Sequence, residues 1–268
     1  MLGIKNKVLG NENIRNPPSD DEYVIINSLF ENNCEIGVSA LALTVLELIR
    51  ENQIRCEISL NGPYSVGKKL TQNDLAAMGN ITLRIANKGE LKSSQTAAIN
   101  LLKSMNKSKK FTLRHMARQS NNPSIANKFE KDFMEFAKAV KIENGYDSKD
   151  YGDILENGKL TKSGKILKNE WKDFQKYLKS RDLSERYPPR SSDENSSQML
   201  YAACFGIERD ALRLRKNDTV LTDFMDKDGY RLLNIIFANA LSHVTQKRDD
   251  KGVFYGAYDK YAIPGGVI

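Results

Sequence analysis

The stretch from Gly62 to Lys69 reads GPYSVGKK and has the spacing of a phosphate-binding loop. In such a loop, G-x-x-x-x-G-K surrounds the phosphates with backbone N–H groups, and the residue after the lysine is a Ser or Thr that holds Mg²⁺. Here that residue is Lys69, which offers no lone pair to a metal, and Pro63 has no N–H to donate. We therefore expect a turn that leads into a polar excursion between two strands, with no nucleotide site.

Three cysteines and two histidines are the other side chains that commonly bind metals or act as nucleophiles. Cys34, Cys56 and Cys204 are far apart and match no metal-ligand spacing. Thiols of this kind suit a reducing interior, where they pack as small apolar side chains. His115 and His243 each stand alone in a helical context, which favours structural or surface roles. The sequence therefore predicts no metal site.

Paired carboxylates serve general acid–base catalysis in many enzymes, and two pairs here have a suitable spacing. Asp132 and Glu135 lie on a solvated helix face, and Asp147 and Asp150 lie in a polar linker. Surface solubility explains both pairs better than catalysis does. We therefore predict that the chain is not an enzyme, with no catalytic residues and no cofactor.

The overall composition is that of a soluble protein with packed cores. The chain has 268 residues, of which 40% are hydrophobic and 28% are charged. No apolar run approaches the ~18 residues that a membrane-spanning helix needs. Residues 1–18 form a polar leader that lacks the apolar region of a signal peptide. These features predict a cytoplasmic chain without a transmembrane segment.

The net charge of +7 is concentrated in one segment. From Lys88 to Lys141 there are 12 Lys and Arg against 4 Asp and Glu, so this segment carries the whole basic excess. Such an excess favours weak contact with a polyanion, either nucleic acid or anionic lipid headgroups. The candidate contacts are Lys107, Lys109, Lys110, Arg114, Arg118, Lys128 and Lys131.

The elements over residues 19–87 follow the order helix, helix, strand, loop, strand. Ser19 and Ser39 are placed to cap the two helices, and Ile54–Leu60 and Ile81–Ala86 alternate as strands do. This order is typical of a winged helix, and it makes the GPYSVGKK stretch part of the wing. We predict a winged-helix-like domain here.

Residues 88–143 have the outline of a basic helix-turn-helix domain. A helix over Ser94–Met105 is followed by a short one that Thr112 caps, and Asn122 and Pro123 open a third. The apolar residues of the third helix share one face, so we expect a core rather than a base-stacking platform. Its outer face mixes lysines with carboxylates, which argues against reading of DNA bases.

The remainder is predicted to be a linker over 144–158, a helical domain over 159–250 and a tail over 251–268. In the helical domain, Thr161 is placed to cap a long helix. Apolar side chains then recur at helical spacing, which predicts core anchors. Gly206 is expected inside a further helix, where it would allow close helix packing despite its cost of about 1 kcal/mol. The predicted anchors are Trp171, Phe174, Tyr201 and Gly206. The fold class expected is mainly α with short β wings, an α+β chain of winged-helix-like units followed by a helical C-terminal region.

Several short motifs occur together in a fixed order over roughly three quarters of the chain. The first has the form R-x-P-P-[ST]-D-D, and the second is a helix of the form A-T-[IL]-x-[DE]-L. They are followed by L-T-x-x-G, W-x-x-F-x-x-[FY]-L, P-P and Y-A-x-x-x-G-[IV]. The matching residues are Arg15, Pro17–Asp21, Leu43–Leu48, Ile54, Leu160, Thr161, Gly164, Trp171, Phe174, Tyr177, Leu178, Pro188, Pro189, Tyr201, Ala202, Gly206 and Ile207.

In these motifs the chain resembles the YciQ-like family of predicted prokaryotic membrane proteins, a family of unknown function. Family members often carry membrane helices where this chain has only the linker 144–158. The resemblance therefore implies either a soluble relative or a cytoplasmic portion of a larger protein, at the inner face of the membrane. It implies a non-catalytic interaction or scaffold module with an unidentified protein partner. The alternative is a winged-helix nucleic-acid-binding protein that uses the basic segment 88–141.

Overall fold

The computed structural model describes residues 16–19, 22–30, 35–62, 64–66, 71–86, 89–146 and 151–245. Lys68, Lys69, Cys34, the predicted tail and all but the end of the predicted leader lie outside these ranges. The helices are α1 (Tyr23–Phe30), α2 (Val38–Arg50), α3 (Gln72–Met78), α4 (Ser93–Asn106), α5 (Leu113–Ser120), α6 (Pro123–Asn144), α7 (Lys162–Lys179), α8 (Arg181–Arg186), α9 (Ser192–Cys204), α10 (Glu208–Leu212), α11 (Val220–Asp226) and α12 (Gly229–Thr245). The strands are β1 (Ile54–Ile58), β2 (Ile81–Ile85), β3 (Lys110–Thr112), β4 (Leu155–Glu156) and β5 (Lys159–Leu160).

Helices dominate the described part of the chain, and the strands are short. The first three form one antiparallel sheet in the order β1-β2-β3, and β4 and β5 form a hairpin. The prediction of a mainly helical α+β chain is confirmed. Among the described residues, no helix is both long enough and apolar enough to cross a bilayer.

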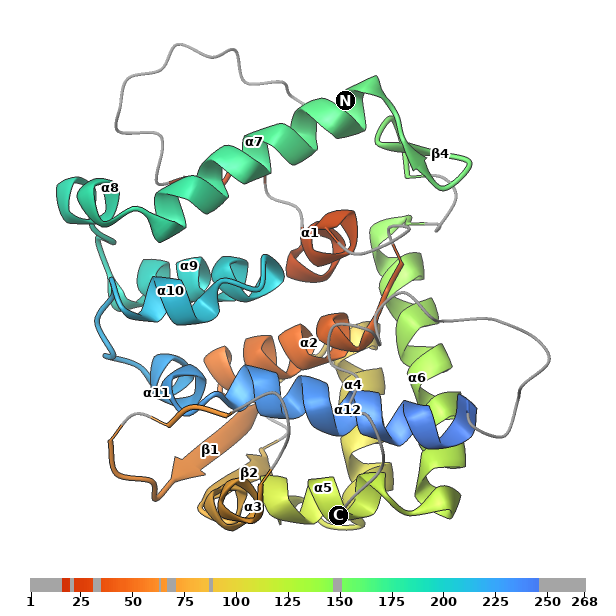
Figure 1. Cartoon of the computed structure of the whole chain (residues 1–268). Coiled ribbons are helices and arrows are strands. Elements are labelled where there is room, and N and C mark those ends of the chain that lie inside the picture. Colours follow the sequence, from red (N-terminus) through yellow and green to blue (C-terminus); the bar gives the residue numbers. More distant parts are fainter. Residues whose placement is uncertain are drawn as a thin grey trace.

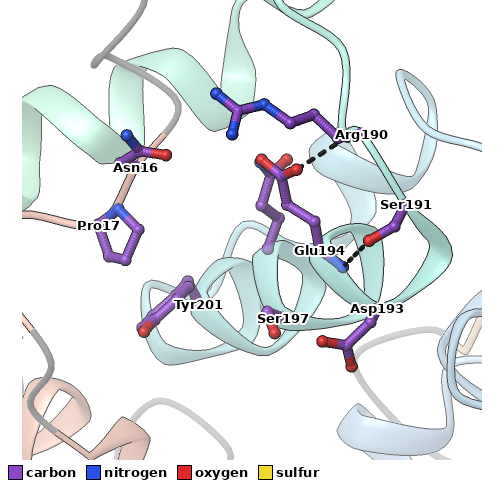
Figure 2. A pocket seen from close by; sticks show the side chains of 9 residues that line it. Asn16, Pro17, Arg190, Ser191, Asp193, Glu194, Ser197 and Tyr201 are labelled. Carbon is purple, nitrogen blue, oxygen red and sulfur yellow. Dashed lines mark hydrogen bonds between the residues drawn. The ribbon is translucent and has the colours of Figure 1, made fainter.

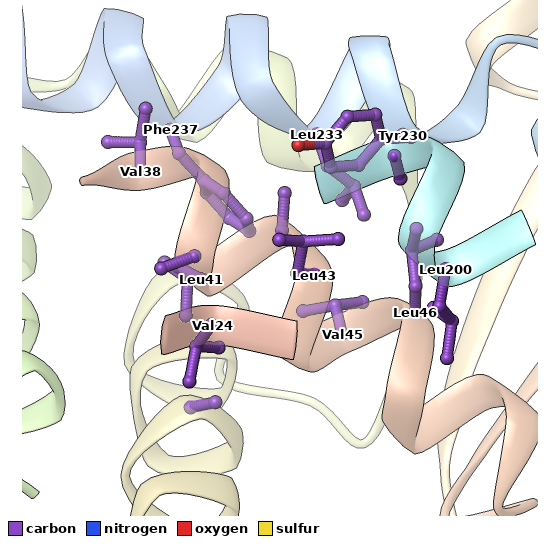
Figure 3. Packing of buried hydrophobic residues seen from close by; sticks show 14 of the residues in the cluster. Val24, Val38, Leu41, Leu43, Val45, Leu46, Leu200, Tyr230, Leu233 and Phe237 are labelled. Carbon is purple, nitrogen blue, oxygen red and sulfur yellow. The ribbon is translucent and has the colours of Figure 1, made fainter. Parts of the chain in front are cut away.

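Helix α2 lies at the centre of the fold. Eleven of its thirteen residues are buried, as expected for a helix that is apolar on all sides. It contacts α1, α4, α9, α11, α12 and β1, so that one hydrophobic core joins segments from both ends of the chain. Figure 3 shows Leu43 of α2 facing Leu233 and Tyr230 of α12, with Leu200 of α9 beside them.

The three-stranded sheet lies at one end of the molecule, next to α3 and α5 (Figure 1). Its inner face is apolar: Ile81, Leu83 and Ile85 of β2 are buried, together with Ile54 of β1 and Phe111 of β3. Because side chains alternate between the two faces of a strand, the intervening residues point away from the core.

A short helix stands where the sequence indicated a polar excursion. Thr71 accepts the N–H of Asp74, whose carboxylate in turn accepts the N–H of Thr71, and this capping box starts α3. The sheet also joins segments that the sequence analysis assigned to different domains. Strand β2 lies in the predicted domain 19–87 and pairs with β3, which lies in the predicted domain 88–143. The division into domains stays a prediction.

Several helix starts follow the sequence closely. Thr112, Asn122 and Thr161 each accept a backbone N–H as caps of α5, α6 and α7, which confirms the three predicted caps. Ser39 is not a cap: α2 begins after Gly37, and the buried Ser39 hydroxyl donates to the Asn27 side chain at 2.9 Å. The Ser39 hydroxyl is therefore bonded to Asn27 and does not cap α2.

The expectation for Gly206 is wrong, because this glycine ends a helix instead of lying within one. Its φ of +64° is left-handed, and it follows Phe205 at the end of α9. The N–H of Ile207 donates to Ala202 and that of Gly206 to Ala203, at 2.9 and 3.0 Å. This pair of hydrogen bonds is the Schellman motif, in which glycine is favoured at the left-handed position. The exposed Gly206 marks the break between α9 and α10.

Close backbone approach occurs at a different glycine. Gly164 lies in the first turn of α7, and a Cβ built there would overlap the carbonyl oxygen of Ile154. That carbonyl precedes the β4–β5 hairpin and accepts the N–H of Thr161 at 3.0 Å. The glycine of L-T-x-x-G therefore lets α7 pack directly against the hairpin.

The other three predicted anchors lie together in the core. Trp171 of α7 is fully buried, and its ring centroid is 5.8 Å from that of Phe174 and 5.2 Å from that of Tyr201 on α9. Phe174 and Tyr201 meet edge to face at 5.6 Å. The aromatic cluster fixes α7 on α9.

Candidate polyanion-binding face

Three basic side chains lie side by side on the outer face of the sheet. Arg55 of β1 is paired in register with Arg84 of β2, and Arg84 is paired with Lys110 of β3. All three are exposed. Residues directly opposite on antiparallel strands point to the same face, so these three form a continuous line of positive charge. We call Arg55, Arg84 and Lys110 the basic row.

The apolar residues that alternate with the row along β1 and β2 keep its side chains on the outer face. Burial alternates along β1, where Arg55 and Glu57 are exposed and Ile54 is 1% exposed. In the same way, Leu83 and Ile85 hold the other face of β2 against the core. A one-residue slip of either strand would bury the basic side chains, and the hydrophobic pattern prevents this.

One exposed carboxylate partly compensates the row. Glu57 accepts a hydrogen bond from Lys110 Nζ at 2.8 Å and lies 3.8 Å from Arg84. The bond from Lys110, together with its charge, lowers the pKa of Glu57, so the carboxylate is ionised at neutral pH. A single negative charge thus contacts two of the three cations, and the row keeps a net positive charge.

Two further lysines lie at the turn that precedes β3, the strand that carries Lys110. Lys107 ends α4 in the left-handed conformation with φ +50°, and Lys109 follows two residues later. Both side chains are exposed. The carbonyl of Lys109 accepts the N–H of Ile85 at 2.8 Å, which fixes the turn to the end of β2. The turn therefore holds the backbone of Lys109 against the end of β2.

Helix α5 carries the next two predicted contacts. Arg114 and Arg118 are exposed and one turn apart, and Met116 and Ala117 bury the opposite face of the helix. The side chain of Arg114 lies against the end of α3, since its Cδ would be 3.5 Å from a Cβ placed on Gly79. Figure 1 shows α5 beside the sheet at the lower edge of the view.

The last two predicted polyanion contacts, Lys128 and Lys131, lie on α6. Lys128 and Lys131 are exposed, and the ring of Phe129 between them packs inward on Phe133 and on Phe237 of α12. The structure therefore places Lys107, Lys109 and Lys110 at the start of β3 and in the turn before it, whereas Lys128 and Lys131 are on α6.

The sequence interpretation missed Arg55 and Arg84. Alternation along each strand could have placed them on the polar face, as it placed Ile54 and Ile85 on the apolar one. Their alignment with Lys110 depends on strand register over three segments that are distant in the chain, which no local pattern reveals. The relevant signal is a basic residue on the polar side of each predicted strand.

A second feature is a polar pocket of about 310 Å³ at the start of α9 (Figure 2). Its two carboxylates are already engaged. Asp193 accepts hydrogen bonds from Arg50, and Glu194 accepts the N–H of Arg190 at 2.8 Å. Ser191 accepts the N–H of Glu194 as the helix cap. These bonds fasten α9 to α2 and to the preceding loop, and we assign the pocket no chemistry.

The described cysteines are poorly suited to nucleophilic chemistry. Burial raises the pKa of the Cys56 thiol to about 12, and burial also raises the pKa of Cys204 well above its usual value. Since the thiolate is the reactive form, both stay as thiols at neutral pH. No group of three or more metal-binding side chains occurs within the described ranges.

Comparison with protein families, curated proteins and solved structures finds no match to this chain.

Proposed function

We propose that this chain is a non-catalytic interaction module that contacts a polyanionic partner through the basic row and the adjoining lysines. The observation that carries this proposal is the direct cross-strand pairing of Arg55 with Arg84 and of Arg84 with Lys110. Like charges opposite one another destabilise a sheet, by up to about 1 kcal/mol per pair. The row therefore opposes folding, and an anionic ligand would offset its repulsion.

The rest of the molecule suits a supporting role. One core holds the sheet to α2 and α12, so the row is presented on a rigid base. We infer that the winged-helix-like unit of residues 19–87 and the basic helix-turn-helix-like unit of residues 88–143 act together as one module. In the YciQ-like interpretation, this unit works in the cytoplasm, at the inner face of the membrane, beside an unidentified protein partner.

The proposal is tested with heparin as a generic polyanion. Fluorescence-monitored titration of the whole chain should show weak binding that falls steeply as salt rises, because electrostatic contacts release counterions. Arg84→Gln should weaken it, and Lys162→Gln, at an exposed lysine at the start of α7, should leave it unchanged. Equal affinities for both variants and wild type would refute the proposal.

A further inference from the structure

The outward side chains of the sheet distinguish among classes of polyanion. On the three strands these side chains are Arg55, Glu57, Thr82, Arg84, Lys110 and Thr112. None is aromatic or aliphatic. The four large apolar side chains that are most exposed in the described chain, Met134, Ile142, Ile166 and Val220, lie on α6, α7 and α11 instead.

This composition favours one partner over two others. Binding to single-stranded nucleic acid relies on aromatic side chains on which unpaired bases stack, and the face has none. Stable binding to a membrane surface commonly inserts apolar side chains among the lipids, and the face has none of these either. A duplex presents phosphates at its surface and keeps its bases inside, so charge alone suffices for contact.

The geometry of the row also fits a duplex backbone. Neighbouring strands lie about 4.8 Å apart, so three paired side chains extend over roughly 10 Å. Phosphates of one DNA strand advance about 3.4 Å per step along the helix axis, and they lie farther apart than this because the strand winds around the axis, so the row is long enough to reach neighbouring phosphates of one strand. Two of the three side chains are arginines, whose planar guanidinium donates two parallel hydrogen bonds to a phosphate.

The breadth of the sheet argues against reading of the bases. The major groove admits an α-helix or a two-stranded ribbon, whereas this face is the broad side of a three-stranded sheet. It also lacks the Asn and Gln side chains that pair with adenine. The face would therefore lie along the backbone without entering a groove.

We propose that the basic row, with Lys107 and Lys109, binds the phosphate backbone of double-stranded nucleic acid without sequence preference. This inference rests on the proposed function and names the partner. Glu57 is an internal competitor, because its carboxylate occupies Lys110 at 2.8 Å and neighbours Arg84 at 3.8 Å. A phosphate must displace it, so removal of its charge should strengthen binding.

The test measures fluorescence anisotropy with a labelled random-sequence DNA duplex, at several salt concentrations. Replacement of the whole row by glutamine should lower affinity at least tenfold. The slope of log K against log salt should fall by about 0.9 for each lost contact. Glu57→Gln should raise affinity several-fold. The matched control replaces Lys128, Lys131 and Lys138, exposed lysines of α6, by glutamine, and should change affinity less than the row does.

Single-stranded DNA of the same length and phosphatidylserine vesicles serve as competitors. We expect both to bind more weakly than the duplex, and two unrelated duplexes to bind alike. If the row binds vesicles or single strands in preference, the duplex inference fails while the proposed function stands. If neither heparin nor any of these ligands binds through the row, both fail. Unchanged melting of the row variant establishes that any loss of affinity is not unfolding.

Discussion

Two clusters use arginine in opposite ways. In the first, Arg209 donates to both carboxylate oxygens of Asp228 and to the carbonyl of Val66 at 3.0 Å. Asp228 is only 4% exposed and also accepts the N–H of Val66. In the second, the basic row faces solvent with one exposed carboxylate among three cations. The first cluster satisfies its charges within the fold, and the second leaves an unsatisfied excess at the surface.

The paired cluster explains what the described part of the GPYSVGKK stretch does. Val66 is 1% exposed, and its backbone is bonded on both sides by Asp228 and Arg209. The Tyr64 hydroxyl donates a hydrogen bond to the Asp74 carboxylate. The stretch is thereby anchored to the junction of α11 and α12 and to α3. The comparison teaches that an arginine paired with a buried carboxylate serves the structure here, whereas the arginines crowded on the exposed face of the sheet are those that we propose to bind a partner.

The largest expected effect is a loss of stability on replacing a buried side chain that carries no charge. Trp171→Ala should lower the free energy of unfolding by about 3–5 kcal/mol, because it removes a fully buried ring that contacts Phe174 and Tyr201. Trp171→Phe, which keeps most of the volume, should cost much less. Urea denaturation measures both. A tryptophan variant as stable as wild type would mean that the aromatic cluster doesn't hold α7 to α9.

The paired arginine cluster should be the most sensitive ionic site. Asp228→Ala leaves Arg209 and the buried Val66 N–H without their acceptor, which should cost about 2–3 kcal/mol. That range is modest for a broken pair because Arg209 is 38% exposed. Asp210→Ala is the control, since Asp210 is exposed and lies 3.8 Å from Arg213. If the two variants melt alike, the cluster isn't structural.

A partly buried carboxylate on α2, Glu47, gives the next effect. Burial raises the pKa of Glu47 to about 7, against the opposing charge of Lys92 at 3.9 Å, and Glu22 and Glu51 add to the rise. The folded chain therefore holds this proton more tightly than the unfolded chain does. Its contribution to stability is full below about pH 4.5 and falls as the pH rises to about 7, by up to about 3 kcal/mol.

Glu47→Gln isolates this contribution. The variant should lose less stability than wild type between pH 5 and pH 8 in urea denaturation. A matched control is Glu90→Gln, an exposed glutamate before α4, which should retain the wild-type pH dependence. Identical profiles for wild type and Glu47→Gln would contradict the raised pKa.

The smallest effect belongs to the basic row and has the opposite sign. Arg84→Thr removes the central charge from between Arg55 and Lys110, so stability should stay level or rise by up to about 1 kcal/mol. Thermal denaturation at low salt measures this change, which should shrink as salt screens the charges. A loss of more than 1 kcal/mol would place Arg84 among the structural arginines.

Local patterns predicted most of the helices and the core. Thr112, Asn122 and Thr161 combine a capping side chain with an apolar stripe after it, and both signals depend only on neighbours in the sequence. The stripe that includes Trp171 and Phe174 is likewise local. The sequence interpretation succeeded where the residue pattern within one helix determines which face of that helix is buried.

Long-range partners decided the rest. Ser39 has a capping side chain but donates to Asn27. Gly206 is an exception, because it forms a local turn with Ala202 and Ala203 at the end of α9. The candidate site was predicted in part, because the charge excess pointed to Lys107, Lys109 and Lys110. Its other half comes from β1 and β2, and only strand pairing places Arg55 and Arg84 beside those lysines.

The most direct test of the basic row is one titration with Arg84→Glu. This reversal places a carboxylate between Arg55 and Lys110, where it attracts both cations, and also beside Glu57, which repels it, so the effects on stability offset one another while the anionic contact is broken. We predict that affinity for heparin at low salt falls at least tenfold, while the melting temperature stays level or rises. Wild-type affinity in a variant that remains folded would contradict the assignment of this face as the binding surface.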